Sequence, residues 1–323
     1  MEKVKRIYFV GIKGVAMAAL AIWAKESGKV VAGSDVMEEF PTDEELKKAE
    51  IDVHEGFDAN HLVLFKPDLV IYTGAHGGRD NPQVVYAKEH TIATFPHGQA
   101  LGIAIAGKRQ IAVAGSHGKT TTSAMIATIL TEAGLDPSYA IGCGSIRGLG
   151  AAGHAGKGNW FVVEADEYVT DSGHDLTPRF LWLKPEVLVV TNIDYDHPDA
   201  YPDLLAVQEA FTLLQKQSKF TFICADDEAS SVLRSADNVV TFGLSEKLNE
   251  LKLQIPGRHN MLNAAAAIAA CERIGIAWEI VKRGLERFGG TKRRFEKLGE
   301  LRGALIYDDY AHHPKEIEAT IAA

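Results

Sequence analysis

The sequence predicts an α/β protein built from parallel sheets, with two complete domains and the beginning of a third. The chain has 323 residues, which is more than one hydrophobic core ordinarily holds. Short apolar runs alternate with helix-like segments along most of its length, as in βαβ units. In addition, the apolar runs RIYFV and IAVA are each followed directly by a glycine turn that leads into a helix-like segment.

The composition excludes several classes of protein. The net charge is −9 and no Lys/Arg-rich run occurs, which argues against a nucleic-acid partner. Three widely spaced cysteines, Cys143, Cys224 and Cys271, indicate buried thiols in a reducing compartment. The first apolar run is too short for a secretion signal, and no run reaches the length of a membrane span. We therefore expect a cytoplasmic protein without membrane insertion, as a monomer or weak homodimer.

The first domain is expected over residues 1–107. Strands at 6–11, 29–35 and 67–74 alternate with helices at 14–28 and 43–50. The loop after the first strand, GIKGVAM, resembles the dinucleotide pattern G-x-G-x-x-G, with Lys13 and Ala16 replacing two glycines. Asp35, after the second strand, fits a ribose contact. We expect Lys13 to compensate for the missing glycine by contacting a diphosphate directly.

A second domain is expected over residues 108–290, with a helix from Thr120 to about Glu132 and a late alanine-rich helix at 260–275. Its strands are expected at 108–115, 160–166, 187–193 and 220–225. Residues 291–323 contain a strand at 303–309 and a helix from 314. About thirty residues cannot bury a core, so we expect an incomplete third domain.

The segment GSHGKTT after the strand at 108–115 ends like a phosphate-binding loop, but its first glycine stands only three residues before the second. A strand, a glycine turn and a helix start place backbone N–H groups and the helix dipole at one point. We expect Lys119 to bridge the β- and γ-phosphates and Thr120 to hold Mg²⁺. The alternative is a tight turn with a threonine cap. The residues of the expected cradle are Gly115, Ser116, His117, Gly118, Lys119, Thr120 and Thr121.

Carboxylates and a histidine follow the next two strands of the second domain. Ligands of parallel sheets bind at the carboxyl ends of the strands, and Mg²⁺ prefers oxygen ligands. These side chains therefore predict a metal site near the phosphate loop, although a solvated acidic turn or an ordinary loop histidine would look the same. They are Glu164, Asp166 and Glu167 after the first strand, and Asn192, Asp194, Asp196 and His197 after the second.

Further polar groups occur late in the chain. Asn260 and Asn263 lie one turn apart on a helix, where they would read an adenine edge or cap the helix. Arg294 carries a guanidinium suited to a γ-phosphate or an acyl phosphate. Asp309 follows a strand and suits a ribose or an incoming amine. The adjacent pair at residues 312 and 313 would equally suit a weak metal pair of histidines.

Taken together and in this order, GSHGKTTT, EADEY, NIDYDH, GRHNMLNAAAA, RRFE and DDYAHHPKE resemble the Mur ligase family over essentially the whole chain. The short G-x-x-G-K-T spacing is similar to that family's own loop form. The resemblance implies a Rossmann-like UDP-binding first domain and a P-loop-type ATPase domain with a parallel sheet. UDP contacts are then expected from Gly11, Ile12, Lys13, Gly14, Asp35 and Thr73.

The resemblance also implies ATP, Mg²⁺ and a ligation that adds L-alanine to UDP-N-acetylmuramate through an acyl phosphate. Thr120, Glu164 and His197 would bind the metal, and Lys119 and Arg294 would neutralise the transferring phosphoryl group. Catalytic roles are thus expected for Lys119, Glu164, His197 and Arg294. The nucleotide would further contact Asn260, Asn263 and, through its ribose, Asp309.

Three alternatives stay open. The first concerns the amine substrate. A murein tripeptide, L-Ala-γ-D-Glu-diaminopimelate, is favoured by EADEY and the insertion at 171–180. L-alanine is favoured by TNI, RRFE and DDYAHHPKEIEAT. The third domain of the family is normally well over a hundred residues, so we expect a truncation, and a non-catalytic UDP-muramate-binding module is the second alternative. A Rossmann oxidoreductase is the third, and it rests on the N-terminal loop alone.

Overall fold

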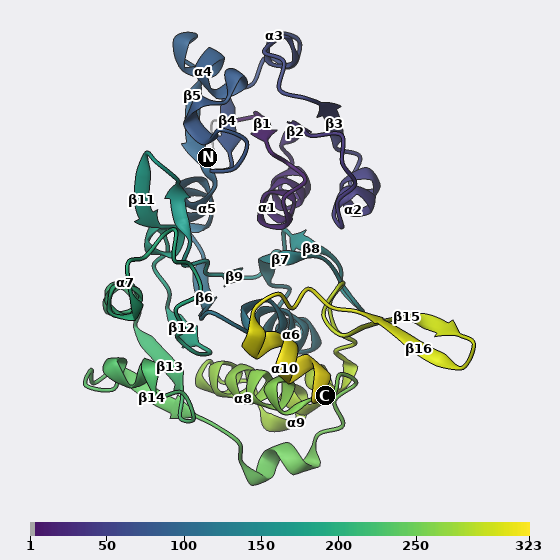
Figure 1. Ribbon diagram of the computed structural model, residues 1–323, viewed down its shortest axis with the longest axis vertical. Coiled ribbons are helices and arrows are strands. Elements are labelled where there is room, and N and C mark those ends of the chain that lie inside the picture. The colour runs from purple at the N-terminus through teal and green to yellow at the C-terminus, as the bar shows by residue number, and fades with distance from the viewer. Residues whose placement is uncertain (1–3) are drawn as a thin grey trace.

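The computed structural model describes residues 4–323 and contains two sheets with their helices, followed by a hairpin and a short helix. Figure 1 shows the first domain, in purple and blue, stacked above the central domain in teal and green. Among the described residues, no helix is long and apolar enough to cross a bilayer.

The first domain is a five-stranded parallel sheet with the strand order β3-β2-β1-β4-β5. The order reverses at β1, so the crevice at the carboxyl ends of β1 and β4 is the expected ligand position. The strands are β1 Arg6–Val10, β2 Val30–Asp35, β3 Asp52–Glu55, β4 Leu69–Tyr72 and β5 Ala93–Pro96. The helices are α1 Val15–Glu26, α2 Asp43–Lys48, α3 Asn60–Phe65, α4 Pro82–Glu89 and α5 His97–Ile105, with a 3₁₀ turn at Gly78–Asp80.

The central domain is a seven-stranded sheet, β14-β13-β12-β6-β9-β7-β8, parallel except for the pair β7 and β8. Its strands are β6 Arg109–Ala114, β7 Ser138–Ile146, β8 Gly150–His154, β9 Trp160–Glu164, β12 Val187–Val190, β13 Phe220–Cys224 and β14 Val239–Phe242. Its helices are α6 Lys119–Glu132, α7 Leu204–Lys216, α8 Arg258–Arg273 and α9 Trp278–Arg287, with 3₁₀ turns at Arg179–Trp182, Ala229–Leu233 and Glu246–Glu250. A separate hairpin joins β10 Val169–Asp171 to β11 Asp175–Pro178.

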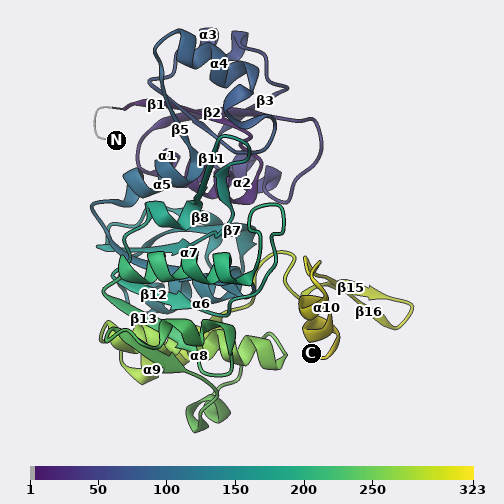
Figure 2. The same cartoon turned by 60° about the vertical axis from the view of Figure 1, so that its left-hand side comes forward.

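The last part of the chain forms the antiparallel hairpin β15 Glu296–Leu301 and β16 Ala304–Asp308, and then helix α10 Pro314–Ile321. In Figure 2 this hairpin projects away from the body of the molecule. Helix α10 returns to the central domain, where the Cβ of Ala323 lies 2.9 Å from the position that a Cβ on Gly257 would take.

The core explains why the two domains stay together. Helix α6 is buried on nearly all sides from Thr120 to Leu130 because the sheet, α8 and α9 surround it. A second cluster of buried residues is continuous between the domains and includes Phe9 and Leu20 of the first and Phe161 of the second. Helix α1 therefore packs directly on β7 and β8.

The predicted α/β fold with two parallel-sheet domains is confirmed. The expected strands at 6–11, 108–115, 160–166 and 187–193 are present but end one to three residues earlier, where their polar loops begin. The antiparallel edge pair β7–β8 was not expected, because Gly142 and Gly144 interrupt the apolar run. The domain limits at 107 and 290 stay predictions.

Candidate active site

The phosphate loop connects β6, flanked by β12 and β9 in the sheet, to helix α6. Gly115 has φ +133°, and a Cβ there would lie 2.0 Å from the Thr191 hydroxyl oxygen. Gly118 has φ +84°, and its Cβ would lie 2.4 Å from Asn263 Oδ1. Both positions need glycine because side chains of neighbouring elements approach the loop backbone closely.

The strand beside the loop holds it in place. Asn192, just past β12, accepts a hydrogen bond from the His117 N–H and donates one to the His117 carbonyl, both at 2.9 Å. The Thr191 hydroxyl donates to the same carbonyl at 2.5 Å. The loop conformation is therefore fixed by the protein itself, which is the preorganisation that an electrostatic site requires.

Lys119 is the charged centre of the loop. Its ammonium donates to the Gly115 carbonyl at 2.6 Å and to the Glu167 carboxylate at 2.9 Å. Burial lowers the pKa of Lys119, but the charges of Glu167, Asp166 and Glu164 outweigh burial and raise the pKa above its ordinary value. Lys119 is therefore a cation whose charge faces carboxylates and is available to a phosphate.

Glu164 ends β9, whose residues pair with those of β6, so its carboxylate lies beside the start of α6. It accepts a hydrogen bond from the Thr120 hydroxyl at 3.1 Å and from the Gly142 N–H at 2.8 Å. Burial raises the pKa of Glu164 above its ordinary value, although the nearby Lys119 charge opposes this. A second positive charge at this position would stabilise the ionised carboxylate.

His197 and Glu167 form the other side of the centre. His197 Nε2 lies 3.6 Å from Glu167 Oε1, and Glu167 is only 2% exposed. The hydrogen-bonding contact with Glu167 raises the pKa of His197. Glu167 thus lies between Lys119 and His197. It is one of the three carboxylates that the sequence indicated after this strand, although only Glu164 was expected to bind the metal.

The donor set around Lys119 suits Mg²⁺. Three carboxylates face Lys119, those of Glu164, Asp166 and Glu167, so their charge exceeds that of the ammonium. Glu167 is buried and the other two are half-buried, and the Asp166 carboxylate accepts a hydrogen bond from Arg179 at 2.7 Å. Magnesium takes a few protein oxygens and completes its shell with water and phosphate. The groups that fit are the Thr120 hydroxyl and the Glu164 and Glu167 carboxylates, with His197 beside them.

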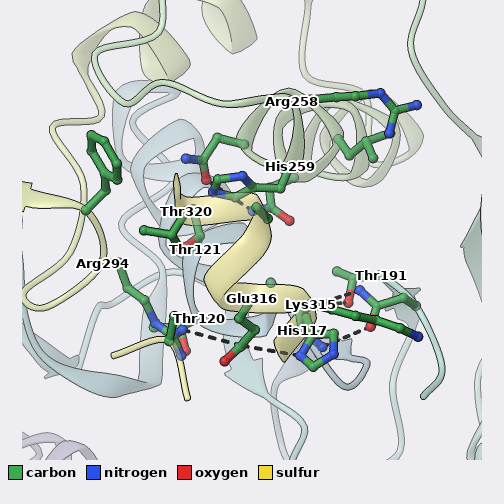
Figure 3. Close-up of a pocket in the computed structure, with 18 of the residues that line it drawn as sticks. His117, Thr120, Thr121, Thr191, Arg258, His259, Arg294, Lys315, Glu316 and Thr320 are labelled. Carbon is green, nitrogen blue, oxygen red and sulfur yellow. Dashed lines mark hydrogen bonds and ion pairs between the residues drawn. The ribbon is translucent and has the colours of Figure 1, made fainter. Parts of the chain in front are cut away.

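A cavity of about 420 Å³ opens on the other side of the loop, and Figure 3 shows its lining. Asn260 and Asn263 at the start of α8 border it, and the Asn263 amide donates to Asn260 Oδ1 at 3.3 Å. Both asparagines are buried, and Asn263 Oδ1 faces Gly118 of the loop. The Asn260 amide donates to the Pro256 carbonyl at 2.6 Å, which fixes its orientation. The loop residues Gly118, Thr120 and Thr121 line the same cavity.

The C-terminal segment closes this cavity. Asp309 lines it, but its carboxylate accepts hydrogen bonds from the N–H groups of Phe295 at 2.6 Å and Ala311 at 2.7 Å. Arg294 Nη1 lies 3.7 Å from the Glu316 carboxylate of α10, and in Figure 3 Glu316 points from that helix toward His117 and Arg294. Sequence reasoning did not single out Glu316, because nothing local indicates that α10 folds back.

Burial raises the pKa of Glu316, but the contact with His117 and the Arg294 charge outweigh it and hold the pKa at about 2. His117 Nδ1 lies 3.3 Å from Glu316 Oε1. The carboxylate is therefore ionised under ordinary conditions, and it faces the loop in which a triphosphate would bind. An anion of the protein thus stands where an anionic ligand is expected.

The residues expected to bind UDP lie at the crevice of the first sheet. Gly11 has φ +82°, and a Cβ there would lie 2.3 Å from Thr73 Cγ2, so the loop after β1 and the end of β4 are in close approach. Gly14 precedes the first turn of α1. The N–H groups of Gly11 and Ile12 donate to the Ser34 carbonyl at 2.8 and 3.1 Å, which folds the loop onto the end of β2.

Lys13, which is expected to contact a diphosphate, has partners within the chain. Its Nζ donates to the Glu38 carbonyl at 2.8 Å and lies 3.7 Å from Asp43, while its N–H donates to the Asp35 carboxylate at 2.7 Å. Asp35 is 1% exposed, and His76 Nε2 lies 3.4 Å from it. Glu38 lies in the loop between β2 and α2, and Asp43 begins α2, so the path of this loop brings both to Lys13, which the local sequence does not reveal.

The fold and the site define a protein with a Rossmann-like sheet and a separate phosphate-loop domain, and two family profiles match these two parts. "Mur ligase family, catalytic domain" matches residues 6–109, and "Mur ligase middle domain" matches residues 113–271. The chain belongs to the Mur ligase family.

Individual relatives agree with the family. The UDP-N-acetylmuramate–L-alanine ligase of Desulfitobacterium hafniense is 39% identical, over 98% of this chain and 74% of that protein. A crystal structure of the UDP-N-acetylmuramate-alanine ligase of Thermotoga maritima is 30% identical with TM-score 0.84, over 99% of this chain and 77% of that one. The structure of a UDP-N-acetylmuramate:L-alanyl-γ-D-glutamyl-meso-diaminopimelate ligase from Neisseria is 29% identical with TM-score 0.80, over 90% of this chain and 99% of that one. The chain thus spans about three quarters of the length of the first two relatives.

Proposed function

We propose that the protein joins L-alanine to the muramoyl carboxylate of UDP-N-acetylmuramate at the expense of ATP. It is an ATP-dependent ligase, as are its Mur family relatives. The observation that carries the proposal is the loop cation Lys119 facing Glu164, Glu167 and His197, in a chain that is 39% identical to an L-alanine ligase.

The reaction has two steps. An oxygen of the muramoyl carboxylate attacks the γ-phosphorus of ATP, the bond to the β-bridging oxygen breaks, and an acyl phosphate and ADP result. The amine of L-alanine then attacks the acyl carbon, loses a proton, and releases phosphate as the amide forms. Both steps bring anions together, so the principal requirement is charge neutralisation and orientation.

The residues of this chain meet that requirement in distinct ways. Lys119 supplies a positive charge at the loop, and the N–H groups at the start of α6 add the helix dipole. Arg294, at the edge of the cavity, offers a second cation once it exchanges Glu316 for phosphate. Asn260 and Asn263 would orient the nucleotide base, with Asp309 near its ribose.

Magnesium would be held by the Thr120 hydroxyl, the carboxylates of Glu164 and Glu167, and His197. When bound, it would neutralise phosphate oxygens. The first domain would hold the UDP group at the crevice formed by Gly11, Gly14 and Thr73, with Ile12, Lys13 and Asp35 beside it. A cytoplasmic location fits these nucleotide substrates and the three buried, unpaired cysteines.

A second candidate is ligation of the tripeptide L-Ala-γ-D-Glu-diaminopimelate to UDP-N-acetylmuramate. The insertion that forms the hairpin β10–β11 favours it, and the Neisseria ligase of this specificity has a similar structure, with TM-score 0.80. Identities of 34–39% to L-alanine ligases favour L-alanine.

The test is phosphate release from ATP and Mg²⁺ in the presence of UDP-N-acetylmuramate, with L-alanine, with tripeptide, or with neither. Release that depends on L-alanine supports the proposal, and release that depends only on tripeptide replaces it by the second candidate. Absence of release with either amine, while UDP-N-acetylmuramate still binds, would indicate a binding module.

A further inference from the structure

Three side chains with metal-binding atoms meet beside the phosphate loop, and none of them belongs to the magnesium position. His117 comes from the loop, Asp194 from the segment after β12, and His313 from the residue that precedes α10. One ligand atom of each lies within 4.8 Å of the others. The His117 and His313 ring centroids are 4.9 Å apart, and His117 Nε2 is 3.6 Å from Asp194 Oδ2.

Three of the four ring nitrogens of this cluster lack hydrogen bonds. Both nitrogens of His117 and Nδ1 of His313 are buried, and none has a hydrogen-bond partner within residues 4–323. The nearest anions to His117 are Asp194 at 3.6 Å and Glu316 at 3.3 Å. Burying a polar atom without a hydrogen bond costs free energy. His117 Nδ1 faces the Glu316 carboxylate, so His117 Nε2 and His313 Nδ1 are the two buried nitrogens that indicate a missing partner.

The backbone holds the three positions independently of any ligand. The Asp194 N–H donates to the Ser116 hydroxyl at 2.8 Å, and the same hydroxyl donates to the Asp194 carbonyl at 3.2 Å. The His313 carbonyl accepts the first hydrogen bond of α10, from the Ile317 N–H at 3.0 Å. Ligands of tetrahedral zinc, each about 2.0–2.1 Å from the ion, are roughly 3.4 Å apart. Small side-chain rotations would bring the cluster to that spacing.

We propose that His117, Asp194 and His313 form a binding site for a divalent transition metal of the zinc class. Two imidazoles and one carboxylate suit Zn²⁺, Co²⁺ or Ni²⁺ and leave a further coordination position open. Magnesium, which prefers oxygen ligands, would bind instead at Thr120, Glu164 and Glu167. Because His313 directly precedes α10, the bound ion would tie that helix to the phosphate loop.

Lys315 is a competitor for this ion that the protein carries itself. Its ammonium lies 2.6 Å from Asp194 Oδ2, the same oxygen that faces His117. The Lys315 side chain is 67% exposed, so it can leave for solvent at little cost. Metal binding therefore replaces the Lys315 ammonium at Asp194 by the metal ion. We expect that removing Lys315 raises the affinity for the metal.

The experiment titrates the chelator-treated full chain with Co²⁺ in excess Mg²⁺ and without nucleotide, and follows the visible bands of four-coordinate cobalt. Zn²⁺ is then added to displace the cobalt. We expect one saturable site, an affinity at least about 100-fold lower in His313→Ala, and a several-fold higher affinity in Lys315→Met. His312→Ala is the matched control, because the neighbouring His312 is 64% exposed and contacts Glu316 instead.

Two results would overturn the proposal: absence of saturable Co²⁺ binding, or binding that His313→Ala and His312→Ala change equally. The opposite effect expected of Lys315→Met separates loss of a ligand from loss of folding. Since no nucleotide is present, the outcome does not depend on the proposed ligase activity.

Discussion

At the scale of single residues, Lys119 has the largest expected effect on activity. We expect Lys119→Met to lower phosphate release by about 10²–10³-fold, the usual effect of removing one preorganised group that stabilises transition-state charge. The substitution also leaves Glu167 buried without its cation, which costs about 3–5 kcal/mol of folding free energy. Lys216→Met, at the exposed end of α7, is the control. A Lys119→Met protein with the wild-type rate would contradict the assignment.

Gly118 tests whether the loop needs its close contact with α8. In Gly118→Ala, the positive φ costs about 1–2 kcal/mol and the new methyl group displaces Asn263. We expect both a lower stability toward urea and a higher KM for ATP. Gly134→Ala has a similar φ but open space around it, so it reports the backbone cost alone, and Gly107→Ala has neither cost. Equal KM values in Gly118→Ala and Gly134→Ala would show that the Asn263 contact does not matter.

At the scale of elements, the sequence predicted what is local and missed what depends on distant segments. The strand-loop-helix unit around Lys119 is encoded within one stretch, so it was predictable from its pattern. The position of Glu167 depends on the turn after β9, and Glu316 reaches the cavity only because the last helix folds back across it. Lys13 could not be placed from the sequence for the same reason, since its partner Glu38 lies in a loop of irregular path.

The contact between α1 and β8 gives a prediction about pH. Glu26 Oε2 accepts a hydrogen bond from His154 Nδ1 at 2.7 Å, across the junction of the two domains. This hydrogen bond raises the pKa of His154 above its ordinary value of 6.5. Burial alone would raise the pKa of Glu26, but the contact with His154 outweighs burial and lowers the Glu26 pKa below 4.5. The charged pair therefore makes its full contribution to folding stability between pH 4.5 and pH 6.5, the ordinary pKa values of Glu and His. That contribution disappears as pH rises through the raised His154 pKa, or falls through the lowered Glu26 pKa.

We therefore expect His154→Gln to flatten the dependence of unfolding free energy on pH from 6 upward, as measured by urea denaturation at a series of pH values. His90→Gln is the control, because His90 caps α4 of the first domain and contacts Tyr86 of that same helix, away from the junction. If the unfolding free energy of the wild type is as flat with pH as that of His154→Gln from pH 6 upward, the pair makes no contribution in solution.

At the scale of the whole molecule, the sheets of the first and central domains are joined by a continuous core, not by a linker alone. Trp23 of α1 meets Phe161 of β9 edge to face with ring centroids 6.0 Å apart, and both belong to or pack against the same buried cluster. Such an arrangement keeps the crevice of the first sheet, where we propose that UDP binds, and the phosphate loop in a fixed relation. Fixed relative position favours reaction between groups bound to different domains.

Gly153 is the position at which this junction can be tested. A Cβ there would lie 1.9 Å from the Ala19 carbonyl oxygen in the middle of α1, and neither backbone can move without separating the helix from β8. Overpacking of this kind costs about 1–3 kcal/mol, so we expect Gly153→Ala to lower the urea midpoint while Gly107→Ala leaves it unchanged. Because the strain lies between the domains, the loss should also appear as a lower kcat with little change in KM for ATP. A destabilised variant with wild-type kcat would mean that the junction supports the fold without positioning the two substrates.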